Sequence, residues 1–190
     1  DAAVASIQKW DREQDTTLYF GVGAFAGHSY IADNGRTRWY RKQEHATWFK
    51  ALALDLDIGA GTPYQTQSEG WKALNAALTA IGMPTPMVVS SGRGIHCYWP
   101  LEQPIQKAHW EKGSIALRMA LEEQHVVIDT SKIHDPSMVL RPVGTHHKKQ
   151  TPWKVVECKR DCPDYDAVAL LTVLKPWFGK APVQSRKAGK

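Results

Sequence analysis

Cysteine and long hydrophobic runs are scarce in this 190-residue sequence. Its three Cys residues are too few, and odd in number, for the disulfide framework of a small secreted domain, and they fit the reducing cytoplasm. No apolar run is long enough to span a membrane and no signal peptide is visible. We therefore expect a cytoplasmic protein with no membrane partner. The chain begins at Asp1 without Met, so we expect the natural N-terminus to lie further upstream.

A structural zinc site built from cysteine and histidine is one alternative for the few sulfur and imidazole groups. Cys158 and Cys162 have three residues between them, and His146 and His147 lie a little upstream. Spacing of this kind occurs in zinc sites. The set is sparse and irregular, so free thiols are the favoured interpretation.

Positive charge exceeds negative charge, with 24 Lys and Arg against 19 Asp and Glu. A basic surface around a local acidic centre suits a polyanionic partner that is processed with metal ions. The alternative is an ordinary, mildly basic protein. Eight Trp slightly favour nucleic acid, since flat rings stack on bases, although we expect most of them in the core.

The acidic centre lies in Ala51–Ile58 (ALALDLDI). Alternate side chains of a strand point to opposite faces, so the apolar residues share one face while Asp55 and Asp57 share the other, about 7 Å apart. Neighbouring carboxylates repel unless a cation lies between them. Hard divalent cations such as Mg²⁺ and Mn²⁺ prefer carboxylate ligands. The stretch therefore favours a metal site over an exposed strand with solvated acids.

Strand and helix patterns alternate along the rest of the chain. Strands are predicted at 17–25, 51–58, 86–91, 94–99, 126–128, 137–144 and 153–158. Helices are predicted at 4–11, after the capping-box pair Thr66 and Glu69, within 104–124, and after a cap at Asp164. This order predicts an α/β (α+β) fold with a mainly antiparallel sheet.

The hairpin predicted over 86–99 carries groups that suit phosphate. Its turn, Ser91–Gly94, exposes backbone N–H groups and has Arg93 at its tip. His96 follows within reach of the same phosphates. A strand histidine taken alone is more often a hydrogen-bonded core or surface group. The phosphate-binding groups of the neighbouring turn favour a role for His96 in binding.

A third carboxylate follows the short apolar segment Val126–Ile128. We expect Asp129 at the end of a buried strand, where the sites of α/β folds collect. Asp135 is the competitor, but it lies in a loop and more simply makes a turn. Downstream, Thr145–Lys149 is dense in groups that hold phosphate.

Three motifs in this order give the chain a family resemblance. They are Asp55-Leu56-Asp57 after an apolar strand, VVSSGRGIHCYWPL at 88–101, and VIDTSKIHDPSMVLRPVGTHHKK at 127–149. Together they resemble the archaeo-eukaryotic primase (AEP) superfamily, in particular the primase-polymerase domains of bacteriophage and plasmid replication proteins. The resemblance covers roughly residues 17–158. It implies a two-lobed α/β core with an RRM-like sheet flanked by helices.

The resemblance also implies the acidic part of an active site. Asp55 and Asp57 match the metal ligands of the first motif, and Asp129 matches the acid of the third. Mg²⁺ or Mn²⁺ is the implied cofactor. His96 matches the second-motif histidine that contacts the triphosphate of the incoming nucleotide.

The basic part follows in the same way. The implied nucleotide-binding residues are Ser91, Gly92, Arg93, Gly94, His96, Arg141 and Lys148. The last two fall in a segment that usually reads R-x-P-G-T, followed by a polar residue and Lys. Here Pro142 directly follows Arg141, so the proline and its neighbour are exchanged, and the shape of the local turn differs.

The resemblance implies a metal-dependent nucleotidyltransferase that makes primers, and extends them, on single-stranded DNA during phage or plasmid replication. Nucleoside triphosphates, a DNA template and a fused or associated helicase are the implied partners. The catalytic domain is expected over residues 1–178, with a basic flexible tail at 179–190. Two alternatives remain: a non-catalytic module that binds single-stranded or origin DNA, and a metal-dependent nuclease.

Overall fold

The computed structural model describes residues 2–13, 16–27, 29–39, 41–149 and 151–180. Most of the predicted tail, residues 181–190, lies outside this described part. Among the described residues, no helix combines the length and apolar character needed to cross a membrane.

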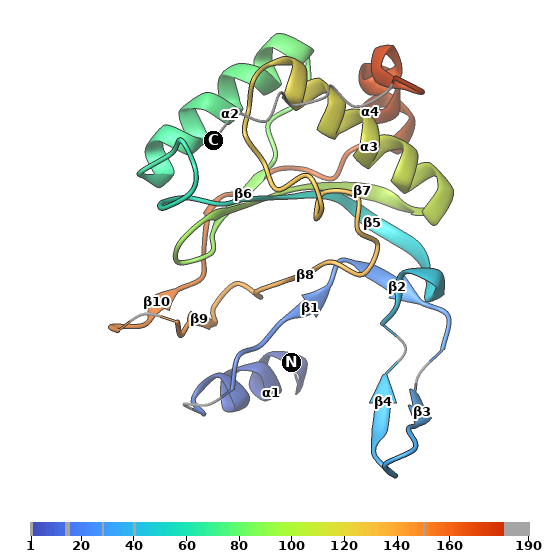
Figure 1. Cartoon of the computed structure of the whole chain (residues 1–190), viewed down its shortest axis with the longest axis vertical. Coiled ribbons are helices and arrows are strands. Elements are labelled where there is room, and N and C mark those ends of the chain that lie inside the picture. Colours follow the sequence, from blue (N-terminus) through green and yellow to red (C-terminus); the bar gives the residue numbers. More distant parts are fainter. Residues whose placement is uncertain (1, 14–15, 28, 40, 150, 181–190) are drawn as a thin grey trace, which may run out of the picture.

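A five-stranded antiparallel sheet forms the centre of the fold, as the sequence predicts (Figure 1). β5 and β7 are its long central strands and share the most extensive pairing. In spatial order, the strands are β11 (Glu157–Arg160), β6 (Met87–Ser90), β7 (Ile95–Gln106), β5 (Ala46–Leu56) and β2 (Gly23–Phe25).

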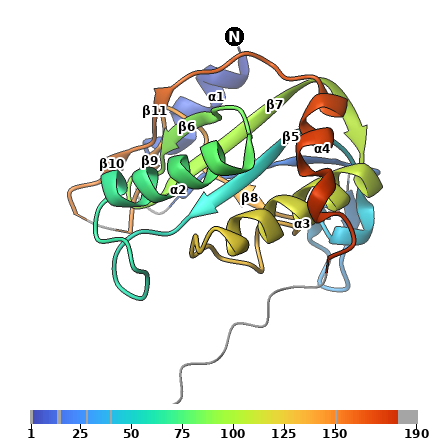
Figure 2. The same cartoon turned by 90° about the horizontal axis from the view of Figure 1, so that it is seen from above.

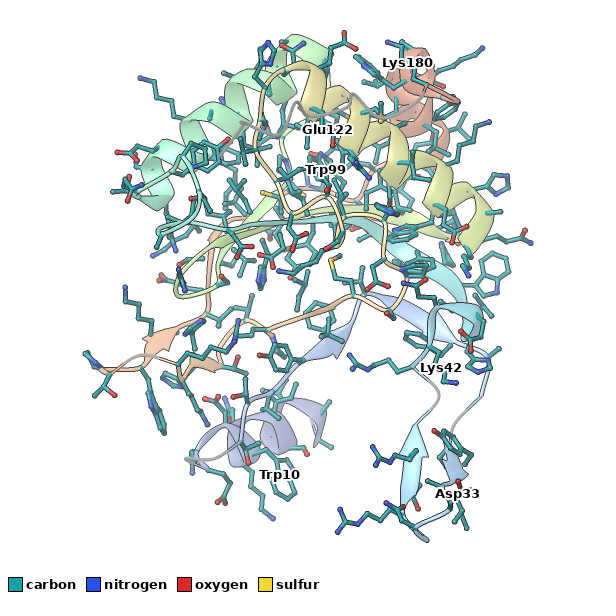
Figure 3. All side chains as sticks on the ribbon, in the orientation of Figure 1. Trp10, Asp33, Lys42, Trp99, Glu122 and Lys180 are labelled. Carbon is teal, nitrogen blue, oxygen red and sulfur yellow. The ribbon has the colours of Figure 1, made fainter. Side chains whose placement is uncertain are left out.

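Helices cover one face of this sheet (Figures 1 and 2). They are α2 (Gln67–Ile81), α3 (Lys107–Glu123) and α4 (Ala167–Leu174), which runs on into η2 (Lys175–Trp177). The core between the two layers is apolar, and Trp99 lies wholly buried within it (Figure 3). Trp110 of α3 stacks on Phe49 with ring centroids 4.1 Å apart and donates Nε1–H to the carbonyl of Ala51. Large rings of this kind dominate the burial that holds helix to sheet.

The chain leaves β5 and enters α2 through the predicted capping box. Thr66 accepts a hydrogen bond from the amide of Glu69, whose carboxylate accepts from the Thr66 amide in return. These bonds satisfy helix-start groups that would otherwise lack a partner. Gly82 then ends α2 in the left-handed region, with φ of 75°.

A smaller second layer covers part of the opposite face of the sheet (Figure 1). Its short strands pair as β1 (Phe20–Gly21) with β8 (Val139–Leu140) and β9 (His146–His147) with β10 (Lys154–Val155). Met138 and Leu140 pack on Ala53, Val89 and Tyr98 of the sheet in a second buried cluster. The remaining elements are α1 (Ala2–Asp11), the hairpin of β3 (Ser29–Ile31) and β4 (Thr37–Trp39), and η1 (Gln43–His45). The predicted two-lobed α/β organisation is confirmed.

Two local predictions are wrong. Val126–Ile128 is not a strand, because its backbone groups bond elsewhere: the amide of Val126 donates to Leu121 at the end of α3, and that of Val127 donates to Tyr64 Oη. The cap of α4 is Asp166 rather than Asp164, since Asp166 accepts from the amide of Ala169. The strand predicted over 17–25 is split into β1 and β2, and only Val139–Leu140 of 137–144 is paired as a strand.

A buried carboxylate fastens α1 to the second layer. Asp11, 6% exposed, accepts hydrogen bonds from the amide and the imidazole of His146. Lys148 Nζ donates to the carbonyls of Asp11 and Glu13. Burial alone raises the pKa of Asp11, but the hydrogen bonds from His146 and the charges of His146 and Lys148 outweigh it and lower that pKa. The ionised carboxylate is therefore the form that holds α1 in place.

We predict that Asp11→Asn lowers the free energy of unfolding by about 1–3 kcal/mol at pH 7, because a buried hydrogen-bonded anion is lost. A lowered pKa contributes stability above the usual Asp value and loses it as the pH falls through the folded-state pKa. The difference between variant and wild type should therefore shrink below about pH 4. Urea unfolding between pH 7 and pH 3 measures it. Asp33→Asn in the exposed β3–β4 turn is the control, and a difference independent of pH contradicts the prediction.

Candidate active site

The register of the two central strands places the first motif opposite the second. Asp55 of β5 lies directly across from His96 of β7, and His96 lies across from Val89 of β6. Leu54 and Leu56 point into the helix-covered core, so Asp55 faces the other side of the sheet. Asp55 and His96 therefore share the face of the sheet that the helices leave open.

The three predicted carboxylates converge on one ammonium group. Lys132 Nζ lies 3.5 Å from Asp55 Oδ2, 3.6 Å from Asp57 Oδ2 and 3.2 Å from Asp129 Oδ2. Burial alone lowers the pKa of Lys132, but the charges of the three carboxylates outweigh it and raise that pKa. A cation therefore already lies where the like charges meet, and it offsets their repulsion.

The three acids differ in their surroundings. Burial raises the pKa of Asp55, and the charge of Asp57 adds to this rise, while Lys132 opposes it. Asp57 lies just beyond β5, with its side chain 55% exposed. For Asp129, burial also raises the pKa, but hydrogen bonds from the amide and hydroxyl of Ser131 and from Lys132 bring it below its usual value. Ser131 thus holds the Asp129 carboxylate in its ionised form.

Oxygen donors of this kind fit Mg²⁺ or Mn²⁺. The oxygens that surround Lys132 Nζ at 3.2–3.6 Å must close in to reach the roughly 2.0–2.1 Å of a magnesium–oxygen bond. As they stand, the described residues contain no group of three His, Cys, Asp or Glu side chains that could hold a metal ion. Binding of a metal by these carboxylates would require them to move closer together and the ammonium to leave. With 43% of its side chain exposed, Lys132 has room to do so.

His96 is a buried neutral donor beside Asp55. Burial, helped by the positive charges of Arg141 and Lys132, lowers the pKa of His96 to about 3. Its Nδ1 lies 3.2 Å from Tyr98 Oη, and its Nε2 lies 3.8 Å from Asp55 Oδ1. Burial raises the pKa of Tyr98, so the phenol keeps its proton. We assign the ring proton of His96 to Nε2, because Nε2 faces the Asp55 carboxylate; in this tautomer Nδ1 accepts from the Tyr98 hydroxyl.

The predicted phosphate turn is closed by reciprocal hydrogen bonds. Ser91 donates its amide to the carbonyl of Gly94, and the amide of Gly94 donates to Ser91 Oγ. A Cβ at Gly92, where φ is 91°, would lie 2.6 Å from Cβ of His147, and one at Gly94 would lie 2.6 Å from the carbonyl oxygen of Leu56. The glycines therefore let the turn pass close to both β5 and β9. Arg93 is exposed and donates Nε–H to the carbonyl of Ile58.

These elements enclose a polar pocket of about 270 Å³ between the sheet and the second layer. Arg141 Nη2 donates to Tyr19 Oη, and its guanidinium lies 5.0 Å from the Tyr19 ring centroid. Arg141 Nε and His147 Nδ1 are buried and have no hydrogen-bond partner among the described residues. Such groups are rarely left unpaired in a native protein. The pocket is lined by Tyr19, Asp55, Asp57, Ser91, Arg93, Gly94, His96, Lys132, Val139, Leu140, Arg141, His147 and Lys149.

Three predicted residues lie outside this lining. Asp129 reaches the pocket acids through Lys132, and Gly92 lines a neighbouring hollow. Lys148 is not brought to the pocket, because its Nζ is held by the backbone of α1. Its neighbours His147 and Lys149 line the pocket instead.

Sequence reasoning missed several groups of the site. Lys132 lies three residues after Asp129, but the sequence does not indicate that its side chain turns back onto the acids. Tyr98 shares the face of His96 by strand alternation, which is the one signal that could have identified it. Asp135 makes the predicted turn, accepting from the amide and hydroxyl of Ser137. The zinc alternative finds no support among the described residues, where His146 pairs with Asp11.

Comparison with solved structures identifies the fold. The AEP domain of the primase-polymerase of cyanophage S-2L matches with a TM-score of 0.63 and 22% sequence identity, covering 90% of this chain and 76% of that one. The chain has the AEP fold. The polymerase domain of Mycobacterium tuberculosis Ligase D, in complex with DNA, matches with a TM-score of 0.46 and 18% identity, covering 84% and 60%. No protein-family model and no curated protein sequence matches the chain.

The resemblance predicted from three motifs is thus confirmed for the AEP fold. At 22% identity, the structural similarity establishes the fold of this chain but not the reaction that its site residues perform. The roles of the site residues remain predictions that rest on the geometry described above.

We predict that Lys132→Met binds Mn²⁺ about tenfold more tightly than wild type in the absence of nucleotide, because no ammonium competes for the carboxylates. Electron paramagnetic resonance of free Mn²⁺ measures the affinity. Lys149→Met removes an equal charge from the pocket lining without a carboxylate contact, so it should have a smaller effect. Unchanged or weaker Mn²⁺ binding by Lys132→Met contradicts the prediction.

We predict that Tyr98→Phe weakens the binding of a nucleoside triphosphate about two- to tenfold, because His96 loses the hydrogen bond that fixes its tautomer. The Mn²⁺ affinity should not change. Isothermal titration calorimetry measures both quantities. Tyr165→Phe, which removes a hydroxyl bonded to the Thr85 carbonyl, is the matched control. Equal nucleotide affinities in wild type and Tyr98→Phe would show that the Tyr98–His96 contact has no role in binding.

Proposed function

We propose that this protein is a metal-dependent nucleotidyltransferase that synthesises primers, and extends them, on single-stranded DNA. One observation carries the proposal. Two of the carboxylates that meet around Lys132 line the same small pocket as Arg141 and His147, which carry unpaired buried nitrogens. Transfer of a nucleotidyl group needs both: groups that hold a triphosphate and groups that hold divalent cations.

The basic wall holds the triphosphate. Arg141 Nε and His147 Nδ1 are buried nitrogens in need of a partner. A phosphate oxygen satisfies Arg141 Nε–H, and it satisfies His147 in the tautomer that carries its proton on Nδ1. His96 contributes a neutral N–H, which binds an anion without adding charge next to Asp55. Arg93 donates Nε–H to the carbonyl of Ile58. That bond does not use the Nη groups of Arg93, and a guanidinium matches the geometry of a phosphate.

The acidic wall holds Mg²⁺ or Mn²⁺ through Asp55, Asp57 and Asp129. Bound there, a divalent cation lowers the pKa of an attacking 3′-hydroxyl and neutralises charge on the leaving pyrophosphate. Ser131 keeps Asp129 ionised and oriented for this task. A cation bound there would displace the ammonium of Lys132 from the carboxylates, and Lys132 would then be free to pair with the phosphates.

Primer synthesis requires a template and nucleoside triphosphates as partners. The net charge of +5 supports a polyanionic template. A fused or associated helicase and a place in phage or plasmid replication extend the same proposal through the likeness to the AEP domain of a phage primase-polymerase. The proposed localisation is the cytoplasm.

We predict that Asp55→Asn lowers nucleotide incorporation at least about 100-fold, because the side chain keeps its shape but loses the charge that attracts a divalent cation. The assay uses labelled nucleotides on single-stranded DNA with Mg²⁺ or Mn²⁺, with and without an annealed primer. Asp135→Asn, outside the pocket, is the control and should retain activity. Full activity of Asp55→Asn in a clean preparation would overturn the site.

The products of this assay separate the proposed function from its rivals. Longer products on a primed template support a polymerase, and products without a primer support a primase. Shortened DNA identifies a nuclease. DNA binding that EDTA does not change, with no incorporation under either metal, identifies a non-catalytic binding module.

A further inference from the structure

A basic groove leads away from the candidate active site. It consists of two hollows of about 400 and 300 Å³. Arg93 lines both the first hollow and the active-site pocket, so the three spaces follow one another. The two hollows share Gln67, Ser90 and Lys159. We define the basic groove by its charged and aromatic residues, Arg93, Lys154, Lys159, Arg160 and Trp71.

The groove lies where four elements meet. β6 and the edge strand β11 contribute Ser90, Lys159 and Arg160, the start of α2 contributes Trp71, and β10 contributes Lys154. Figure 2 shows the start of α2, β9 and β10 at the end of the molecule opposite α4, and Gln67 of α2 and Lys154 of β10 line the same hollow. This location places the groove beside the phosphate turn and away from the β3–β4 hairpin.

The charge of the groove is one-sided. No acidic side chain belongs to the lining of either hollow among the described residues. Lys159 is compensated by Glu157 on the same strand, 2.5 Å away, whereas Lys154 is exposed and forms no ion pair within the described chain. A row of positive charge with so little compensation is complementary to a phosphodiester backbone.

An aromatic ring completes the groove. Trp71 is half-buried, with one part packed against the core. The guanidinium of Arg160 lies 6.0 Å from its ring centroid. An aromatic ring beside a cation is a pairing with which single strands are bound without sequence preference, because the ring stacks on a base and the cation contacts the backbone.

We propose that the basic groove binds a single DNA strand, with phosphates against Lys154, Lys159 and Arg160 and a base against Trp71. The inference rests on the proposed function and deepens it, because it gives the template a path that joins the active-site pocket at Arg93. Free phosphate groups of a nucleotide share the same chemistry, so the test has to separate a strand from a nucleotide.

The test compares two double variants that remove equal charge. Lys154→Ala/Arg160→Ala changes the groove outside the catalytic pocket. Lys112→Ala/Lys175→Ala changes exposed residues of α3 and η2 on the helical layer. Binding of a fluorescent single-stranded oligonucleotide is measured by anisotropy in EDTA across a salt series, and binding of a nucleoside triphosphate is measured separately with Mn²⁺. Thermal unfolding checks that both variants fold.

The groove variant should bind the oligonucleotide roughly five- to tenfold more weakly at about 50 mM salt. Its slope of log affinity against log salt should fall by about 1.4, or 0.7 for each lost phosphate contact. In the control variant, the oligonucleotide affinity and the salt slope should both change less than in the groove variant. The groove variant should bind the nucleoside triphosphate with wild-type affinity. An equal loss in both variants, an unchanged slope in the groove variant, or a loss of nucleotide affinity alone overturns the proposal.

These outcomes are distinguishable from failure of the proposed function. If the groove variant loses oligonucleotide affinity while wild type incorporates no nucleotide, the proposed groove is supported and the proposed polymerase activity is wrong. If wild type incorporates nucleotides while the groove variant keeps the wild-type oligonucleotide affinity and salt slope, the polymerase activity is supported and the proposed groove is wrong.

Discussion

The pairing of β5 with β7 is the constraint on which the site depends. Because side chains alternate along a strand, a slip of one residue would send Asp55 into the apolar core and bring Leu54 or Leu56 to the pocket. The buried leucines make that slip costly, because burying each leucine side chain contributes about 1.5–3 kcal/mol to stability. The packing of the helical layer thus fixes the position of the acid opposite His96. Glycines at 92 and 94 then let the phosphate turn approach both β5 and β9.

Charge balance in the pocket follows from that register. The sheet supplies two acids and a neutral histidine, and the loop after α3 supplies both Asp129 and Lys132. One lysine between three carboxylates makes the arrangement tolerable without a metal, and its exposure leaves it free to exchange for one. The opposite wall carries Arg141 and His147, each with an unpaired buried nitrogen. A site of this kind is prepared for a ligand that brings negative charge and cations together.

Some of this arrangement could be predicted from sequence, and the reasons are physical. Period-two alternation in Ala51–Ile58 indicated which side of the strand the acids share, and the Thr66–Glu69 spacing indicated where α2 begins. Local pattern failed where long-range contacts decide. Val126–Ile128 reads as a buried strand, yet Tyr64 and Leu121 take its amides. Lys148 is drawn to α1 by Asp11, 137 residues away. Lys132 was missed because the return of a loop onto the sheet has no periodic signature.

Under the proposed function, Asp55, Asp57 and Asp129, which surround Lys132 Nζ, would hold a divalent cation beside a triphosphate bound to the basic wall. The most direct measurement is the anomalous scattering of Mn²⁺ in crystals grown with Mn²⁺ and a non-hydrolysable nucleoside triphosphate. We expect a manganese peak between the three carboxylates, with Lys132 turned away and phosphate density against Arg141 and His147. Strong phosphate density elsewhere, or carboxylates that still enclose Lys132 with no manganese between them, would contradict this expectation.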